Sequence, residues 1–456
     1  MPIKTPNRMQ TDLLEWSKGK NVIPVEADLA LGKTGAGILL CAAKAKRTLA
    51  VVPKNTFKHW VAETYNFSEL TSAVATGNRQ RKLTALMAPV DIVFINPESI
   101  RRLKKEILEL VEKGVFDCLL IDELTRWRRW SEQTKALTKI ARFLPIKVAL
   151  TGRVVTESLS DIFNPARILW GKASPFGNSI FNFHNKYFAQ DPNDSYKWIP
   201  TTYGKQTITR ILAKKFFRAY EEDYFADVEK PVFYTRHITL TEEQKALLGQ
   251  LRDDWEMHID NHIIEMDYIT QKIGKAHQVS SGFIYLNDDP EQRVSKRKIH
   301  YFPYNPKIQT LTSMLEEIGD KPIVIWCVYE AERALLIQLM KKLGKTVCTE
   351  ENWHEFNDGK GDIFISTYKK SGQGIELQRA SNAILFSRTM DHDLYRQALG
   401  RTRRQPKWNC TYQILETNAI VDKLITKLLK TKQSLGEYIK LEGVEYLCQL
   451  KKQNVF

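Results

Sequence analysis

The sequence predicts an α/β protein with two parallel-sheet domains and a helix-rich segment between them. Short apolar runs of about four to six residues recur along the chain, separated by helical stretches such as 100–113 and 330–343. A run that is apolar at every position is typical of a strand buried on both faces, as in a parallel sheet covered by helices. The length of 456 residues allows two or three domains, each with its own core.

The apolar runs fall into two groups, which sets the expected domain boundary. The first domain is expected to hold strands at 48–53, 91–97, 118–123 and 147–152. The second is expected to hold strands at 321–327, 362–367, 382–386 and 411–415. Residues from about 164 to 295 are richer in helix patterns and aromatic side chains. We therefore predict one domain at 1–228, with a helical insertion at about 164–228, and a second at 229–456. The second is expected to end in helices, among them an amphipathic helix over 420–450.

The amino-acid composition indicates which kind of partner and which cell compartment to expect. Lys and Arg outnumber Asp and Glu by 68 to 53, a formal net charge of +15. This excess suits a polyanionic partner, although a basic, solvated surface explains it equally well. No apolar run approaches the roughly 18 residues that span a bilayer. Residues 1–6 lack the apolar stretch of a signal peptide, so we expect a cytoplasmic protein. The six scattered cysteines are expected to be buried free thiols.

A possible phosphate-binding loop follows the first apolar run. Residues 27–34 match the P-loop pattern, except that Ala27 stands in place of its first glycine. Backbone N–H groups at the start of a helix bind phosphate oxygens. In such a loop Lys33 pairs with the β- and γ-phosphates, and the Thr34 hydroxyl is a ligand of Mg²⁺. Taken alone the match is weak, because a glycine before a helix is common.

Two carboxylates strengthen the nucleotide hypothesis. Asp122 and Glu123 directly follow four apolar residues, at the end of a predicted strand, where a P-loop protein has its second metal ligand. Asp122 would hold Mg²⁺, and Glu123 would orient and deprotonate the attacking water. The alternative is an ordinary helix start with favourable acidic residues.

A basic helix in the second domain supplies the third part of the predicted site. Arg401 and Arg404 are three residues apart, and so share one helix face. Arginines presented from another domain can stabilise the charge that develops on a γ-phosphate. The alternative is a run that faces solvent or nucleic acid, as we expect for Arg403.

The order of these motifs resembles superfamily 2 helicases, and among them the Swi/Snf-like DNA translocases of the compact phage and annealing-helicase branch. The resemblance covers nearly the whole chain, and its segments are a Q motif at 8–16, motif I at 28–34, motif Ia at 51–60, the Asp-Glu box at 122–125, motif III at 150–153, the entry to the second motor domain at 230–244, motif V at 367–377 and motif VI at 397–404. It implies two RecA-like motor domains, with ATP and Mg²⁺ as cofactors.

The resemblance also implies roles for further residues. Those implied to bind the nucleotide are Arg8, Gln10, Leu31, Gly32, Lys33, Thr34, Gly374 and Glu376, and Gln397 joins Lys33, Asp122, Glu123, Arg401 and Arg404 in catalysis. Those implied to contact DNA are Lys54, Asn96, Arg153 and Lys369. The chain departs from the family pattern at Ala27, at Thr125 in place of histidine, at Arg153-Val154 in place of Thr-Pro, and at Glu376 in place of asparagine.

The stretch 126–130 interleaves cations with aromatic rings. Arg126, Trp127 and Arg128 could meet a DNA strand or junction by stacking and charge. The alternative, equally supported, is that the tryptophans belong to the core.

Together these features predict an ATP-dependent DNA translocase or helicase that remodels forked or branched DNA in replication, recombination or repair. We expect a monomer that acts on DNA, in the host cytoplasm if the source is a virus. Two alternatives stay open: a strand-separating DNA or RNA helicase, and a DNA-binding accessory protein that does not hydrolyse ATP.

Overall fold

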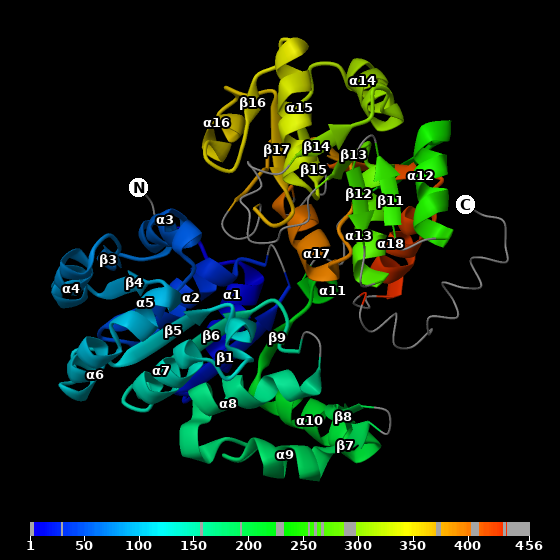
Figure 1. Cartoon of the computed structure of the whole chain (residues 1–456). Helices are drawn as coiled ribbons and strands as arrows, with labels where there is room; N and C mark the ends of the chain where they lie inside the picture. The colour runs from blue at the N-terminus through cyan, green and yellow to red at the C-terminus, as the bar shows by residue number, and fades with distance from the viewer. Residues whose placement is uncertain are drawn as a thin grey trace. The chain divides into compact units, whose positions relative to one another are not determined.

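The computed structural model describes residues 4–28, 31–155, 158–191, 194–224, 232–253, 256–259, 262–265, 269–286, 298–370, 375–402, 410–431 and 435. The chain divides into two compact units, Met1–Asp227 and Val228–Phe456 (Figure 1). Each unit is built around one parallel sheet, as predicted for an α/β protein with two RecA-like domains.

The first unit contains a seven-stranded sheet in the order β3-β4-β2-β5-β6-β1-β9, with every neighbouring pair parallel. Its strands are β1 (Val22–Ala27), β2 (Thr48–Val51), β3 (Ser72–Ala75), β4 (Ile92–Ile95), β5 (Cys118–Asp122), β6 (Ile146–Thr151) and β9 (Phe217–Ala219). Its first helices are α1 (Arg8–Trp16), α2 (Lys33–Lys44), α3 (Phe57–Phe67), α4 (Arg79–Met87), α5 (Pro97–Arg102), α6 (Lys104–Glu112), α7 (Glu132–Ala141) and α8 (Phe163–Trp170).

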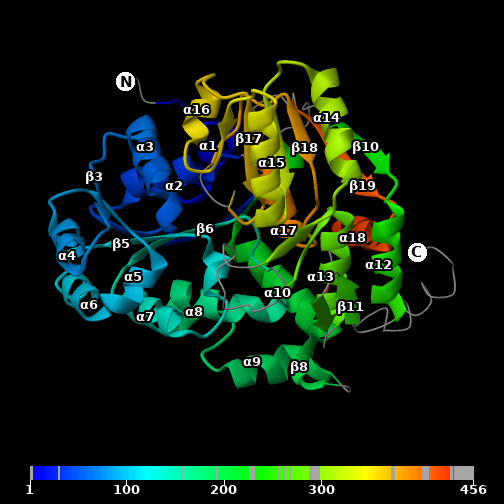
Figure 2. The ribbon, with the colours of Figure 1, turned by 45° about the horizontal axis from the view of Figure 1, so that its top comes forward.

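Helices cover both faces of this sheet. Helices α1, α2 and α3 lie on one face and α5 to α8 on the other, as Figure 2 shows. Strand β5 illustrates why its sequence is apolar throughout: Leu120 packs with α2 and α3, whereas Leu119 and Ile121 pack with α5 to α8.

The insertion of the first unit is only partly helical. It contains α9 (Ile180–Tyr187), an antiparallel hairpin of β7 (Phe188–Asp191) and β8 (Asp194–Pro200), and α10 (Thr202–Lys215). The chain then returns to the main sheet as β9 and continues into α11 (Glu221–Tyr224). Phe183 and Tyr187 are buried in the core, so these two aromatic side chains serve packing.

The second unit contains a six-stranded parallel sheet in the order β10-β19-β18-β15-β17-β16. Its strands are β10 (Val232–Ile238), β15 (Ile323–Cys327), β16 (Val347–Cys348), β17 (Ile363–Thr367), β18 (Asn382–Leu385) and β19 (Thr411–Thr417). Helices α14 (Pro306–Ile318) and α15 (Glu330–Lys342) pack on one face, and α16 (Trp353–Asn357) and α17 (His392–Arg401) on the other.

A further hydrophobic cluster of this unit is formed by helices away from the two faces of the sheet. It joins α12 (Glu242–Asp253), α13 (Ile269–Ser280) and α18 (Ile420–Thr431). Two antiparallel pairs complete the unit: β11 (Glu256–Ile259) with β12 (His262–Glu265), and β13 (Phe283–Tyr285) with β14 (Ile299–Tyr301). Helix α18 is the described start of the expected helix at 420–450, whose remainder lies outside the described residues apart from residue 435.

The structure bears on the expectations for the cysteines and for membrane-spanning segments. Five of the six cysteines lie in the described ranges, and all five are free and buried. In the part of the chain that the structure describes, no helix combines the length and apolarity needed to cross a membrane.

A buried histidine gives the second unit a predictable pH dependence. His277 on α13 is fully buried, and its Nδ1 lies 3.1 Å from the Tyr329 hydroxyl. Burial lowers the pKa of His277 from 6.5 to about 4; Asp422 opposes this shift, while Lys307 and Arg388 add to it. The folded unit therefore holds the ring neutral at a pH where the unfolded chain protonates it.

We expect the second unit to lose stability as the pH falls from about 6.5 to about 4, because only the unfolded chain takes up this proton in that window. The loss from His277 is complete below about pH 4 and is on the order of 3 kcal/mol. His277→Gln keeps a polar side chain without titrating, so its free energy of unfolding should depend less on pH. Chemical denaturation at pH 7 and pH 4.5 checks this, and identical pH dependence in both proteins would contradict it.

Candidate functional site

The predicted phosphate loop leads from β1 into α2. Gly32 caps the helix with φ +83°, a left-handed conformation that favours glycine. The Lys33 ammonium turns back over the loop and donates hydrogen bonds to the carbonyls of Ala27 (2.8 Å) and Asp28 (3.0 Å). Leu31 is buried, so only its backbone can face a ligand. The helix start and the ammonium together concentrate positive charge, which suits a phosphate group.

Helix α1 supports the loop from the N-terminal side. Asn7 and Gln10 form a capping box, in which each side chain accepts a hydrogen bond from the other's backbone N–H at 2.9 Å. Their amide groups also donate to the loop: Asn7 Nδ2 to the Leu31 carbonyl (3.1 Å) and Gln10 Nε2 to the Gly32 carbonyl (3.0 Å). A Cβ atom on Gly32 would lie only 2.8 Å from Gln10 Nε2. Gln10 therefore holds the loop in position, and its own contact with the nucleotide stays a prediction.

The other predicted nucleotide residue of α1 lies on its surface. Arg8 is exposed, and its guanidinium lies 5.6 Å from the centre of the Tyr224 ring. Tyr224 in turn donates a hydrogen bond to Asp12 (3.1 Å), and burial raises its pKa to about 12 with the help of that bond. Helix α1 is thus attached to α11, the last described element of the first unit.

The two carboxylates lie at the same sheet edge as the loop. Strand β6 separates β5 from β1, and all three are parallel, so their carboxyl ends meet at one edge. Asp122 accepts a hydrogen bond from Trp60 Nε1 (3.2 Å). Burial raises the pKa of Asp122, and the Trp60 bond and the nearby Lys33 charge oppose that rise. The structure therefore brings Lys33 and Asp122 within electrostatic reach of each other.

Glu123 is held in an uncommon backbone conformation. With φ 57° and ψ 71°, it is the one non-glycine residue with positive φ in the described ranges. This conformation costs on the order of 1–2 kcal/mol for an L-residue. Glu123 caps the short 3₁₀ helix Leu124–Trp127, and its carbonyl accepts a hydrogen bond from Arg126 N–H (3.1 Å). Strain of this kind is frequent at functional sites, where it fixes the direction of a side chain.

The donor set fits Mg²⁺. The Thr34 hydroxyl and the Asp122 carboxylate are hard oxygen ligands, which this cation prefers. Among the described residues, no group of three or more His, Cys, Asp or Glu side chains is placed to hold a metal. Mg²⁺ commonly binds through one or two protein oxygens, with water and substrate phosphates as its other ligands. Thr34 and Asp122 match that mode.

Three predicted DNA contacts of the first unit are accessible. Lys54 is exposed at the start of the 3₁₀ helix Lys54–Thr56. Asn96 and Arg126 both donate to one exposed carboxylate, that of Glu98, at 2.5 and 2.6 Å. Asn96 and Arg126, which could bind a DNA phosphate, are thus close together and share one acidic partner. The sequence alone did not indicate a role for Glu98.

The aromatic part of the 126–130 prediction needs a correction. Trp127 is 1% exposed and belongs to the core beneath α7 and α8, so a base cannot stack on it in this fold. The core alternative is the correct one for this residue. Trp130 is 45% exposed instead, and the Arg167 guanidinium lies 4.4 Å from its ring centre. Arg128 and Arg153 are half-buried, and both stay predictions as DNA contacts.

In the second unit, Gln397 and Arg401 lie on α17, four residues apart and half-buried. The Arg401 carbonyl accepts a hydrogen bond from Leu377 N–H (2.8 Å), which attaches the end of motif V to this helix. Glu376 is exposed and its carbonyl accepts a hydrogen bond from Asn357 (2.6 Å). Gly374 and Arg404 lie outside the described residues.

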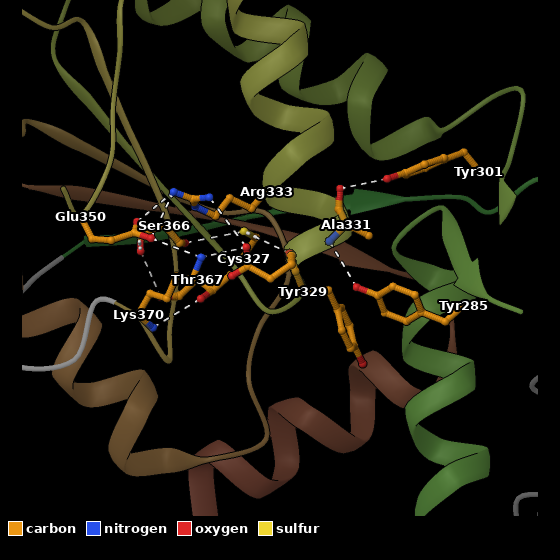
Figure 3. Close-up of polar contacts among 11 residues, drawn as sticks. Tyr285, Tyr301, Cys327, Tyr329, Ala331, Arg333, Glu350, Ser366, Thr367 and Lys370 are labelled. Atoms are coloured by element: carbon orange, nitrogen blue, oxygen red, sulfur yellow. Dashed lines mark hydrogen bonds and ion pairs between the residues drawn. The ribbon is translucent and has the colours of Figure 1, made fainter. Parts of the chain in front are cut away.

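A network of charges surrounds the carboxyl ends of β15 and β17 (Figure 3). Lys370 pairs with Glu330 (3.0 Å) and Glu350 (3.4 Å), and Arg333 pairs with Glu350 (3.1 Å). Ser366 donates a further hydrogen bond to Glu350 (3.2 Å). The turn after β17 is closed by a hydrogen bond from Lys370 N–H to the Thr367 carbonyl (3.1 Å), and Lys369, the predicted DNA contact, is exposed within it.

Comparisons with known proteins bear on the fold of the chain. No family model matches the chain. Protein p41 of the Acyrthosiphon pisum secondary endosymbiont phage 1 is 23% identical over an alignment of 398 residues, and the match covers 83% of this chain and 84% of that protein. The helicase domain of Hef from Pyrococcus furiosus is 12% identical over 92% of this chain and 97% of its own, with a TM-score of 0.53. The chain shares the fold of that helicase domain.

A second solved structure is similar over nearly the full length. The Sulfolobus solfataricus SWI2/SNF2 ATPase core in complex with dsDNA is 20% identical and covers 99% of this chain and 96% of its own, with a TM-score of 0.44. The two parallel sheets and the fold shared with the Hef helicase domain confirm the predicted fold class. The individual site residues stay predictions.

Proposed function

We propose that the protein is an ATP-dependent DNA translocase or helicase that remodels forked or branched DNA. One observation carries the proposal: in a helicase fold, Lys33 and the pair Asp122-Glu123 meet at the carboxyl edge of the first parallel sheet. This edge is where open α/β sheets bind their ligands.

The residues of the first unit divide the chemistry among them. Lys33 and the first N–H groups of α2 would bind the phosphates of ATP, and Thr34 and Asp122 would hold Mg²⁺. The cation would neutralise charge on the phosphate oxygens. Glu123, fixed by its backbone, would orient the attacking water and accept its proton.

The second unit would contribute positive charge. We propose that Arg401 and Arg404 stabilise the transferred phosphoryl group, that Gln397 takes part in the same chemistry, and that ATP binding and release change the relation between the two units. A change of this kind, repeated with each hydrolysis, is what moves a motor along its track.

DNA is the partner that the charge and the exposed donors support. A formal charge of +15 suits a polyanion, and Lys54, Asn96, Arg126, Arg128, Arg153 and Lys369 would contact phosphates without reading bases. Trp127 has no part in this proposal, because it is buried.

Removing the carboxylate that competes for two of these donors should tighten DNA binding. Glu98→Gln keeps the shape of the side chain but loses the charge paired with Arg126, at an exposed site where such pairs are weak. We expect duplex DNA to bind roughly two- to five-fold more tightly, as measured by fluorescence anisotropy at fixed salt. The matched control is Glu106→Gln, which removes a carboxylate paired with Arg79, a residue with no predicted DNA contact. Equal affinity in Glu98→Gln and the wild type would contradict the role of this site.

Remodelling can be tested with labelled substrates. With ATP, we expect the wild-type protein to convert a forked or four-way DNA junction into its branch-migrated products, and Lys33→Ala to leave the junction intact. A protein that separates only a plain tailed duplex would be a strand-separating helicase. A protein that binds the junction but leaves it unchanged at saturating ATP would be an accessory protein.

A further inference from the structure

The insertion of the first unit carries an excess of positive charge that none of the predicted motifs uses. Residues 171–215 contain seven lysines and arginines against two aspartates, about a third of the net charge in about a tenth of the chain. Six of these cations are exposed, and the described residues provide none of them with a carboxylate ion pair: Lys172, Lys186, Lys205, Arg210, Lys214 and Lys215.

Part of this charge is aligned on α10 with an aromatic ring. Arg210 and Lys214 follow Tyr203 by seven and eleven residues, so all three point within about 20° of one direction around the helix. The cations stand roughly 10 and 16 Å from Tyr203 along the helix axis. Tyr203 is 58% exposed, and the buried side of the same helix is formed by Gly204, Thr207, Ile208 and Leu212. The exposed face thus presents one flat ring and two cations in a row.

The ring is held by a rigid helix start. Thr201 caps α10 by accepting a hydrogen bond from Gly204 N–H (3.0 Å), and its own N–H donates to the Tyr187 carbonyl (3.0 Å). A Cβ atom on Gly204 would lie 1.8 Å from that same carbonyl oxygen, so glycine is required for the close contact between α9 and α10. The Tyr203 ring stacks on the buried Tyr187 ring, with centroids 6.2 Å apart and planes 15° apart. One face of Tyr203 is therefore supported by the core.

We infer that this face of α10 binds an unpaired strand of branched DNA, which deepens and rests on the proposed function. Stacking on an exposed aromatic ring is available to a base that has left the duplex, and it tolerates any sequence. Tyr203 receives such a base, and Arg210 and Lys214 bind phosphates of the same strand. The insertion lies on the side of the sheet opposite α1, α2 and α3 (Figures 1 and 2), so this surface is separate from the phosphate loop.

Truncation of the ring tests the stacking contact. With full-length protein and no nucleotide, Tyr203→Ala should bind oligo(dT) and the single-stranded arms of a fork about ten-fold more weakly, and blunt duplex within two-fold of the wild type. Tyr203→Phe keeps the ring and should retain wild-type affinity. The matched control is Tyr65→Ala on α3, since Tyr65 is also 58% exposed in the same unit, and it should bind all three DNAs normally.

Salt dependence tests the two cations independently. Arg210→Ala/Lys214→Ala should lower the slope of log affinity against log salt for oligo(dT) by about 1.4, since each single-strand phosphate contact contributes about 0.7. The control Lys113→Ala/Lys139→Ala removes two exposed cations elsewhere on the unit and should leave the slope unchanged.

The results of these experiments distinguish a failure of the α10 site from a failure of the proposed function. If the wild type binds DNA and hydrolyses ATP in response to it, but both sets of α10 variants bind oligo(dT) as the wild type does, the inference fails alone. The inference also fails if the α10 variants lose affinity for blunt duplex DNA to the same extent as for single-stranded DNA. If the wild type binds no DNA at all, the proposed function fails first.

Discussion

Replacing Glu123 with glutamine is expected to slow ATP hydrolysis by a factor of about 10² to 10⁴, the usual contribution of a general base. The amide has the shape of the carboxylate, so the positive-φ backbone at this position should be kept. Nucleotide affinity should stay within a few-fold of the wild type, because Lys33, Thr34 and Asp122 are unchanged. Steady-state hydrolysis with saturating DNA gives the rate, and a fluorescent ATP analogue gives the affinity.

A matched control isolates the chemistry. Glu112→Gln removes an exposed carboxylate at the end of α6, on the same unit, and should hydrolyse ATP at the wild-type rate. If Glu123→Gln kept more than a tenth of the wild-type rate, Glu123 would not be the base. If it lost nucleotide binding as well, its role would lie in shaping the loop.

Replacing Arg401 with alanine is expected to reduce DNA-stimulated hydrolysis by about 10³-fold or more, the range reported for arginines that stabilise the transferred phosphoryl group. The backbone bond from Leu377 to the Arg401 carbonyl does not depend on the side chain, so α17 should stay attached to the preceding segment. Hydrolysis is measured with saturating duplex DNA.

The control for this variant lies on the same helix. Arg396→Ala removes an arginine five positions earlier, about 140° around α17 from Arg401, and should retain most of the activity. An Arg401→Ala protein that hydrolysed ATP at the normal DNA-stimulated rate would overturn the proposed contribution of the second unit.

The strands that carry the motifs could be predicted because they are buried on both faces. The run Cys118–Ile121 is apolar at every position and is followed at once by Asp122, and the structure has β5 ending there. The same reasoning located β2, β4, β6, β15, β17, β18 and β19. Parallel pairing then brings the carboxyl ends of these strands to one edge in each unit, which is why Asp122 could be placed near the loop from sequence alone.

The sequence did not predict the edge strands and hairpins, because their residues show too little apolar pattern. Strand β3 (Ser72–Ala75) has one large apolar residue, and β9 is three residues long, so neither differs from a loop in the sequence. In the insertion, β7 and β8 pair only with each other, and the run of aromatic residues before them suggested helix alone.

The supporting contacts of the site depended on tertiary structure. The support of the loop by Gln10 and the bond from Trp60 to Asp122 join residues 22 and 62 positions apart, which no local pattern predicts. The capping box of Asn7 and Gln10 could have been predicted from the sequence, because a cap residue followed three positions later by glutamine is typical of a helix start. Trp127 and Trp130 could not be told apart, since a short 3₁₀ turn and a loop give no periodicity that separates a core side from a solvent side.

We propose that this chain couples ATP hydrolysis to its contact with DNA. The direct measurement is the rate of ATP hydrolysis by the wild type and by Lys33→Ala, each with no nucleic acid, single-stranded DNA, duplex, forked DNA and RNA. We predict that DNA stimulates the wild type, with forked DNA the strongest, and that Lys33→Ala stays at background throughout. A wild-type rate that no DNA changes, or that RNA alone stimulates, would contradict this coupling.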